Sequence, residues 1–534
     1  MTGTPNPTSI ASSTAGSHKN PRSRRAFWAA GGILLLLAAL LLSSRIVGPY
    51  VARLADHRRV RHLNYIQVAP NGRYFQFEDG RPFVVIGQNE AITWPYMSDL
   101  YGRFRPEVTE EYLRTLQAHG VNTIRVMAEY AQYDVSYLQN PVGTFVPETV
   151  QYWDDFFALA ERYGIYVIFT PWDTFWMFRN LDRNPWSAEN GGPLEEPRDW
   201  LTDPEVIAAQ KETWRFIIDH WGDSPNILAW ELMNEVDMWW GNTSEEIRQW
   251  TEEMASFVRE YERQRWGKNH LITISVAQAE PTGPLADLVF RHPAIDFANT
   301  HLYYEPSVNN PPDTISAALS VNHGVRHALE QTRDNPRPYL DTESGPIGRW
   351  PLLPDFDVEY YHNMSWAHLA SGGAGQGLRW PYTQPHTLPP EFRQVQAAMA
   401  RFAAAVEWLS FTDPQNIDRQ LTVTAPELIA MGTGDRHRAV VWLLRDTRAQ
   451  AAGSGAGTAG GNSGTQAGGA AQPAGVSGAR LTVAGLAPGT YTVQFWDTWA
   501  GEVREERIME AGSSGLIIDL PVVERSLALY IAPR

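Results

Sequence analysis

Residues 149–171, TVQYWDDFFALAERYGIYVIFTP, contain the unit from which the fold is built. Apolar side chains recur at helical spacing up to Gly164, and a glycine commonly ends a helix. The run IYVIFTP that follows is apolar throughout, which is typical of a parallel strand buried on both faces. We therefore predict a helix followed directly by a buried strand.

The same alternation of amphipathic helix and apolar run recurs through residues 72–408. Helix starts are marked by Asp203 followed by Pro204, and by a capping box from Thr243 to Glu246. The predicted strands are 83–87, 122–127, 165–171, 226–233, 271–276, 296–302, 338–343 and 377–382. A series of this kind predicts the α/β fold known as the (β/α)₈ or TIM barrel.

The sequence pattern changes after Trp408, where short apolar runs alternate with turn residues. This pattern predicts a small all-β sandwich over residues 415–534. Residues 449–478 interrupt it with a stretch composed almost entirely of Ala, Gly, Ser, Thr and Gln. Such a composition cannot pack a core, so we predict a disordered loop between two strands.

Three segments precede the barrel. Residues 1–25 are rich in Ser, Thr and Pro and end in a basic cluster, which predicts a disordered basic N-terminus. Residues 26–47 begin with the uncharged run AFWAAGGILLLLAALLL, near the lower limit of the roughly 17–25 residues that cross a membrane. We predict one transmembrane signal-anchor helix there and a juxtamembrane connector at 48–71.

A cleavable signal peptide is the alternative for the same run. The sequence LLSSRIVG at its end is a poor cleavage site, which favours an uncleaved anchor. The basic cluster before the run favours a cytoplasmic N-terminus. We expect a single-pass protein of the cell membrane with its barrel outside the cytoplasm, or a secreted protein if the segment is cleaved.

The composition excludes several kinds of site. A formal net charge of -16 argues against a nucleic-acid partner, which would require a basic face. The absence of cysteine excludes disulfides, cysteine-ligated zinc and thiol catalysis. The 21 Trp and 21 Tyr include rings that can stack on sugars, although we expect most of them in the core.

Polar side chains follow the predicted barrel strands at the end where (β/α)₈ enzymes carry their active sites. Glu235 follows strand four and Glu343 ends strand seven, so two carboxylic acids face each other across the barrel mouth. One protonated and one ionised carboxyl are the pair that cleavage of a glycosidic bond requires. Other side chains at strand ends are Arg125, Trp172, Asp173, Asn234, His301, Tyr303 and Trp380.

Three segments resemble those of glycoside hydrolase family 5 and its clan of retaining β-glycosidases. SPNILAWELMNEVD at 224–237 is similar to the strand-four signature, and PYLDTESG at 338–345 to the strand-seven segment. RYFQFEDGRPFVVIGQN at 73–89 contains the clan's DGxPF motif. The resemblance covers about residues 72–405 and implies retaining hydrolysis of β-glycosidic bonds in an oligo- or polysaccharide, as in cellulase- or mannanase-like members.

The resemblance also implies roles for the matching residues. Glu235 would be the acid/base and Glu343 the nucleophile, with the first protonated and the second ionised in the resting enzyme. Asn234 would hydrogen-bond the sugar 2-hydroxyl, and Arg125 would steady the nucleophile. Glu231 lies on the same strand face as Glu235, and we interpret it as a buried polar partner of an arginine rather than as a catalyst.

His301 and Tyr303 match the strand-six His-x-Tyr, whose phenol approaches the nucleophile, and Trp380 matches the strand-eight Trp beneath the non-reducing sugar. Ser344 departs from the aromatic residue of many clan members, and Thr-Pro-Trp ends strand three where many cellulases carry a His. Both departures concern the substrate more than the reaction class. Further candidate sugar platforms, in predicted loops, are Trp172, Trp239 and Trp240.

Other interpretations stay open at this stage. The chain could be a non-catalytic carbohydrate-binding or cell-surface scaffold protein that retains the barrel, and transglycosylation would use the same residues. Trp496 and Trp499 could form a carbohydrate-binding face, although we favour packing of the β domain on the barrel. We expect no metal and no organic cofactor, and the sequence does not predict the oligomeric state.

Overall fold

The computed structural model describes residues 64–90, 106–128, 137–238, 241–346, 354–380, 390–448 and 475–534. The predicted anchor at 26–47, the N-terminal tail and most of the predicted loop at 449–478 lie outside these ranges. Within the described ranges, no helix is both long and apolar enough to cross a membrane. Residues His62–Arg534 form one compact unit.

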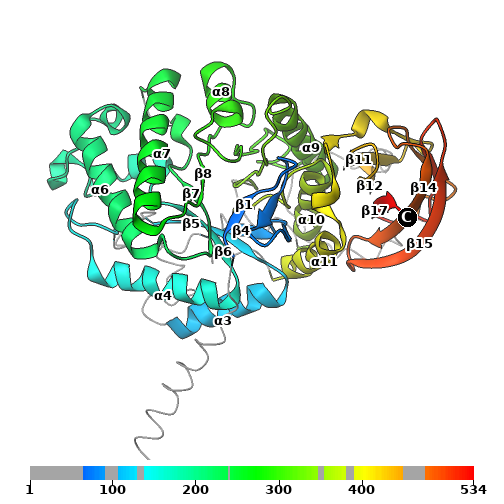
Figure 1. The fold of residues 1–534 in the computed structure, drawn as a ribbon, viewed down its shortest axis with the longest axis horizontal. Helices are drawn as coiled ribbons and strands as arrows, with labels where there is room; N and C mark the ends of the chain where they lie inside the picture. Colours follow the sequence, from blue (N-terminus) through cyan, green and yellow to red (C-terminus); the bar gives the residue numbers. More distant parts are fainter. Residues whose placement is uncertain are drawn as a thin grey trace, which may run out of the picture. The chain divides into compact units, whose positions relative to one another are not determined.

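Five parallel strands form the continuous part of the barrel (Figure 1). They are β4 (Gly87–Glu90), β5 (Thr123–Met127), β6 (Tyr166–Thr170), β7 (Ile227–Glu231) and β8 (Leu271–Thr273), hydrogen-bonded in that order. All of their residues are buried, because the strands are covered by helices outside and by each other's side chains inside. The predicted parallel barrel sheet is confirmed over these strands.

The other three predicted strands close the ring through single parallel bridges rather than long ladders. The bridges pair Ala298 with Tyr339, Ser344 with Arg379, and Val85 with Gly375. At the last of these the backbones approach so closely that a Cβ on Gly375 would lie 2.2 Å from the Val85 carbonyl oxygen. Only glycine fits at such a close approach of two backbones.

Helices cover the outside of the sheet (Figure 1). They are α3 (Pro106–Ala118), α4 (Pro147–Tyr163), α5 (Thr174–Arg179), α6 (Pro204–Trp221), α7 (Ser244–Trp266), α8 (Gly283–Arg291), α9 (Thr314–Gln331), α10 (Pro354–Ala370) and α11 (Phe392–Ala405). Short 3₁₀ helices occupy Ala188–Asn190, Pro197–Leu201, Val236–Met238, Trp408–Ser410 and Asp418–Gln420. The predicted caps are confirmed: Gly164 is left-handed at φ 66°, Asp203 accepts two backbone N–H groups of α6, and the Thr243–Glu246 capping box starts α7.

A small antiparallel sheet closes the end of the barrel where the strands begin. It contains β1 (Ile66–Val68), β2 (Phe75–Phe77) and β3 (Pro82–Phe83). Ile66, Phe75 and Phe83 share a core with interior residues of the barrel strands. Two boundaries therefore differ from prediction: the domain includes β1 from the supposed connector 48–71, and the first barrel strand begins at Gly87 rather than at residue 83, since Phe83 packs in this small sheet.

The C-terminal domain contains two antiparallel sheets with one core between them. The larger has the order β15-β14-β17-β12-β11-β9 and the smaller the order β10-β13-β16. The strands are β9 (Gln415–Asn416), β10 (Leu421–Val423), β11 (Leu428–Gly434), β12 (Ala439–Arg445), β13 (Arg480–Val483), β14 (Gly489–Asp497), β15 (Glu502–Ala511), β16 (Leu516–Asp519) and β17 (Ser526–Pro533). Val476 pairs with Val523, so the last residues of the predicted loop belong to this domain.

The sequence pattern did not reveal β15. Its sequence EVREERIMEA carries charges at most positions, and most of its side chains are exposed. The strand lies at the edge of the sheet and pairs only with β14, where charged side chains protect an open edge from further pairing. Its alternation is therefore one of exposed charges rather than of apolar and polar residues.

The β domain packs on the barrel through aromatic side chains. Trp442, Trp496 and Tyr530 of this domain belong to the same buried cluster as Trp366 and Phe402 of the barrel. The ring of Trp496 meets that of Phe402 edge to face at 5.4 Å between centroids. For Trp496 the favoured packing interpretation is confirmed, because the ring is buried against α11 and is not available to a sugar.

Candidate active site

The barrel brings Glu235 and Glu343 together at the mouth, and both side chains are almost fully buried. One oxygen of each carboxyl and one nitrogen of His301 lie within 4.8 Å of one another. Carboxyl pairs of retaining glycosidases are about 5–5.5 Å apart, and those of inverting enzymes about 6.5–9.5 Å apart. The separation of the two carboxyl groups is therefore that of a retaining enzyme. It leaves no room between them for the water molecule that an inverting enzyme places beneath the sugar.

Arg125 on β5 is fully buried and joins the two carboxylates of strands four and seven. Its Nη1 donates to Glu343 Oε2 at 2.9 Å, while Nε and Nη2 donate to Glu231 at 2.6 and 2.8 Å. Burial alone would raise the pKa of Glu231, but Arg125 holds that pKa below its usual value. The predicted arginine partner of Glu231 is thus found, and it is the residue that also contacts Glu343.

Tyr303 completes the environment of Glu343. Its phenol donates to Oε1 at 3.1 Å, whereas Arg125 donates to Oε2. Each oxygen of the carboxylate therefore accepts a hydrogen bond from a different side, which fixes the plane of the carboxyl group. A carboxylate held in this way is oriented for attack on an atom in front of it.

The side-chain amide of Asn234 is held at both ends. Its Oδ1 accepts from Arg125 Nη2 and from Ser275 Oγ, and its Nδ2 donates to Asp173 Oδ1 at 2.5 Å. The sequence placed Asp173 at a strand end without giving it a role, and it did not single out Ser275. The alternation of inward and outward residues along strand five, with Thr273 and Ser275 on one face, is the signal that could have found the latter.

A chain of hydrogen bonds runs from Glu235 into the barrel. Thr342 Oγ1 donates to Asn299 Oδ1 at 2.8 Å, so its own acceptor faces His301 Nε2 at 3.2 Å. With Nε2–H donating there, the other ring nitrogen, Nδ1, accepts from Glu235 Oε1 at 2.7 Å. Burial lowers the pKa of His301, which favours the neutral ring that this arrangement needs. The chain thus places the proton on Glu235.

The pKa values of the two carboxyls follow from their burial. Burial raises the pKa of Glu235 to about 8, with Asp237 adding to the rise and Arg125 opposing it. Burial raises the pKa of Glu343 to about 7, with Glu235 adding to the rise and Arg125 opposing it. The order agrees with the expectation of an acid and a nucleophile, but the pKa of Glu343 is higher than expected because desolvation outweighs the stabilisation of its ionised form by Arg125.

The backbone of Glu235 is strained. Its φ of 47° is the only positive value at a non-glycine residue in the described part of the chain. Such a conformation typically costs about 1–3 kcal/mol and persists only where the surroundings enforce it. Here the backbone N–H of Glu235 donates to Ser275 Oγ at 2.9 Å. The strain directs the carboxyl of Glu235 toward His301 and the barrel mouth.

The tryptophan candidates divide into three groups. Trp172 is fully buried among the rings of Trp186, Trp200 and Trp214, an arrangement typical of core packing, and its role in substrate binding stays a prediction. Strand alternation explains this, because its neighbour Asp173 takes the position facing Asn234. Trp380 ends strand eight and is 3% exposed. Trp239 and Trp240 lie outside the described residues.

Glu235, His301 and Glu343 also have the composition of a cation site, since each offers a ligand atom. The Arg125 guanidinium lies 2.9 Å from Glu343 Oε2 and would repel a cation bound there. The hydrogen bonds of the group suit proton transfer at Glu235 and attack by Glu343 without a metal. The absence of a metal requirement stays a prediction.

A raised-pKa carboxyl beside a carboxylate held by Arg125 and Tyr303, at the mouth of a (β/α)₈ barrel, is the site of a glycoside hydrolase. The family model described as Cellulase (glycosyl hydrolase family 5) matches residues 80–348. The chain belongs to this family, as the motifs of strands four and seven indicated.

Relatives in the same family act on mannan according to their names. Mannan endo-1,4-beta-mannosidase 4 of Oryza sativa subsp. japonica is 27% identical over 333 residues, which are 58% of this chain and 66% of that protein. Mannan endo-1,4-beta-mannosidase 3 of the same plant is 26% identical over 304 residues, and this match spans 63% of its length. The chain thus spans a little less than two thirds of these two relatives.

Solved structures share the fold over most of the chain. A protein described as a glycoside hydrolase aligns with a TM-score of 0.56 at 13% identity and covers 88% of this chain and 97% of its own. A glycoside hydrolase family 5 protein from Bacteroides vulgatus aligns with a TM-score of 0.55 at 13% identity and covers 88% and 93%. The coverage extends beyond the barrel, which supports an architecture of barrel followed by β domain.

Proposed function

We propose that this protein hydrolyses β-mannosidic bonds of a mannan-type polysaccharide with retention of anomeric configuration. The observation that carries the reaction is the pair of buried carboxyls, Glu235 and Glu343, whose oxygens approach within 4.8 Å. The similarity to plant mannan endo-1,4-β-mannosidases supports the substrate class. The polysaccharide is the expected partner.

In the proposed mechanism Glu343 attacks the anomeric carbon while Glu235 gives its proton to the glycosidic oxygen. The carbon–oxygen bond breaks and a glycosyl ester forms on Glu343. Glu235, now ionised, takes a proton from water, which displaces Glu343 from the same face that the leaving group occupied. Two inversions at one carbon give net retention.

The neighbouring residues support these two steps. Arg125 and Tyr303 orient Glu343 and stabilise its negative charge before attack and after release. Asn234 offers its amide to the 2-hydroxyl, a contact that strengthens as the sugar approaches the oxocarbenium-like transition state. His301 receives the hydrogen bond of the protonated Glu235. Trp380 is proposed to lie beneath the sugar on the non-reducing side of the cleaved bond.

A panel of aryl β-glycosides and β-linked polysaccharides tests this function with protein that lacks residues 1–47. We expect cleavage of an aryl β-mannoside and of β-mannan, with the β-anomer appearing first by proton NMR. No hydrolysis of any aryl β-glycoside would favour the alternative, a non-catalytic carbohydrate-binding protein. An α-anomeric first product would contradict retention.

We also propose that residues 26–47 anchor the protein in a membrane. The support is the uncharged run of residues 26–42. Full-length protein should sediment with membranes and resist extraction by alkaline carbonate, whereas protein lacking residues 1–47 should not sediment. Release of the full-length protein by carbonate or by high salt would contradict the anchor.

Asp173→Asn should shift the acidic limb of the pH profile of kcat/KM to lower pH. The negative charge of Asp173 contributes to the raised pKa of Glu343, so removing that charge lowers this pKa and lets Glu343 ionise earlier. The Asn oxygen can still accept from Asn234 Nδ2, so the amide keeps its orientation. Asp173→Ala removes charge and acceptor together and should lower kcat as well. An acidic limb that stays in place in both variants would contradict this coupling.

A further inference from the structure

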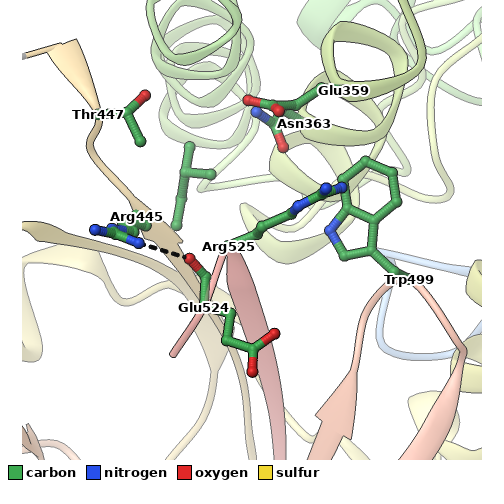
Figure 2. A pocket seen from close by; sticks show the side chains of 8 residues that line it. Glu359, Asn363, Arg445, Thr447, Trp499, Glu524 and Arg525 are labelled. Atoms are coloured by element: carbon green, nitrogen blue, oxygen red, sulfur yellow. Dashed lines mark hydrogen bonds between the residues drawn. The ribbon is translucent and has the colours of Figure 1, made fainter. Parts of the chain in front are cut away.

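A recess of about 140 Å³ lies between α10 of the barrel and the β domain (Figure 2). We call it the junction recess. Its lining includes Glu359 and Asn363 of α10, and Arg445, Thr447, Trp499 and Arg525 of the β domain. Neither domain alone provides a complete lining, so the recess exists only because the two domains are packed together.

The junction recess contains a buried polar group without a partner. Asn363 is 1% exposed, and its Nδ2 has no acceptor among the described residues. Its Oδ1 is already engaged with His362 Nδ1 at 3.0 Å, so the amide is held with Nδ2 free. An unpaired buried donor costs about 1–3 kcal/mol, and a group bound in the recess could accept from it.

The recess is bordered by charges of both signs. Arg445 and Arg525 are cationic, and Glu359 and Glu524 are anionic. Arg445 is fixed by donation from Nη1 to the Glu524 carbonyl at 3.2 Å (Figure 2), and Glu359 accepts from Thr314 at 2.7 Å. A free ion of either sign would meet a like charge, from Glu359 or from the two arginines. A neutral ligand with hydroxyl groups can instead donate to the carboxylates and accept from the guanidinium and amide groups.

Trp499 forms a rigid wall of the recess rather than an open platform. One face of its ring stacks on His362 at 4.1 Å between centroids and 4° between planes. The Arg525 guanidinium covers the ring at 4.9 Å from its centroid. The wall presented to a ligand is therefore a planar guanidinium backed by an indole, which suits hydrogen bonding to hydroxyls along one side of a sugar.

The position of α10 relates the recess to the active site. α10 follows the strand that ends in Glu343, and in a (β/α)₈ barrel each helix begins at the end where the preceding strand stops. Glu359 and Asn363 lie in the second and third turns of α10. The barrel side of the recess is thus formed by the first half of α10, which begins at the end of the barrel that carries the two catalytic carboxyls.

We propose that the junction recess is a secondary sugar-binding site that takes one residue of the polysaccharide outside the catalytic mouth. This inference rests on the proposed function for the nature of the polysaccharide. Its volume is close to the roughly 150 Å³ of a cavity that holds one six-membered carbon ring. Its balanced donors and acceptors suit the hydroxyl groups of a neutral pyranose.

The test blocks the recess from its rim and measures binding of a long and a short ligand. Thr447 is exposed, so Thr447→Trp should fill the recess without disturbing the core. Ser513→Trp, at an exposed turn between β15 and β16, adds the same side chain elsewhere and is the matched control. All binding is measured by calorimetry in a Glu343→Gln background, with β-mannohexaose and β-mannobiose as probes.

We expect Thr447→Trp to weaken the hexaose Kd by about tenfold, as loss of about one hydrogen bond to a charged group would. Ser513→Trp should leave that Kd unchanged, and mannobiose should bind equally to all variants. Arg525→Ala, a second exposed change, should weaken hexaose binding in the same direction. Equal hexaose affinity in Thr447→Trp, Arg525→Ala and the control would overturn the proposal.

A failure of the proposed function can be distinguished from a failure of the recess proposal. Hydrolysis of an aryl β-mannoside by the protein with Glu343 intact reports on the catalytic site alone and should not change in Thr447→Trp. If the substrate panel selects another β-glycan, the hexasaccharide of that glycan replaces mannohexaose in the same comparison. The recess is then supported or overturned by the same difference between Thr447→Trp and Ser513→Trp.

Discussion

Glu343→Gln should lower kcat/KM by at least about 10⁴-fold on every substrate, activated aryl glycosides included. The amide is isosteric with the carboxyl but cannot form the glycosyl ester, and no other described carboxylate accepts from both Arg125 and Tyr303. The loss should not depend on the leaving group, because bond formation to the sugar fails whatever departs. Initial rates on a series of aryl glycosides with different phenol pKa values measure this.

Glu330→Gln, on the outer face of α9, provides the matched control. It makes the same chemical change on a half-exposed side chain and should retain full activity. Circular dichroism and melting temperature should show both variants folded. A Glu343→Gln enzyme that kept within about tenfold of the parent activity on activated substrates would assign the nucleophile to another residue.

The sequence predicted the reacting groups better than their setting. Strand ends in a parallel barrel meet at one rim, so Glu235 and Glu343 could be placed together from the order of the strands alone. Asp173 and Ser275 act on Asn234 from neighbouring strands. Such contacts depend on register, and a shift of one residue would turn either side chain away.

Burial was the property hardest to predict. Trp172 follows a strand as a sugar platform would, yet it faces outward into a cluster of tryptophans. Glu343 was expected to be ionised because Arg125 and Tyr303 contact it, yet burial raises its pKa to about 7. Desolvation depends on all surrounding atoms rather than on the nearest partners, so a list of neighbours at strand ends underestimates it.

The edges of the fold show the same limit. Strands β12 and β17 are buried in the sheet, and burial requires the apolar runs from which they were predicted. The charged edge strand β15 has no apolar run and was not predicted. The strand segments 296–302 and 338–343 were predicted from their apolar residues, but they join by a single bridge. Hydrophobicity indicates where a strand lies in the core and does not indicate how long its ladder is.

The pH profile of the parent enzyme should have two limbs set by the carboxyl pair. Activity requires Glu343 ionised, so kcat/KM should rise as pH increases through about 7. It also requires Glu235 protonated, so kcat/KM should fall as pH increases through about 8. The optimum therefore lies between these values, and the alkaline limb belongs to Glu235.

Glu235→Gln should show losses that depend on the leaving group, unlike Glu343→Gln. Polysaccharide and aryl glycosides with poor leaving groups need a proton on the departing oxygen, and their kcat/KM should fall by about 10²–10⁴-fold. Dinitrophenolate departs without protonation, so formation of the glycosyl-enzyme from a dinitrophenyl β-glycoside should stay close to the parent rate. The alkaline limb should disappear from the pH profile of the Glu235→Gln enzyme, because the carboxyl group that titrates there has been removed.

The second step separates the role of Glu235 as base from its role as acid. Water needs Glu235 to remove its proton, so the glycosyl-enzyme should accumulate with the dinitrophenyl substrate and steady-state turnover should stall. Azide is a nucleophile that needs no base, and adding it should restore turnover and give a β-glycosyl azide. Azide should not give this product with Glu343→Gln, since that variant forms no glycosyl ester.

Two outcomes would contradict the roles assigned to the pair. One is an α-configured azide product from Glu235→Gln, and the other is an equal loss of activity with all leaving groups and no rescue by azide. The β-azide can form only if Glu343 first holds the sugar on the opposite face, so this one product tests both carboxyls together.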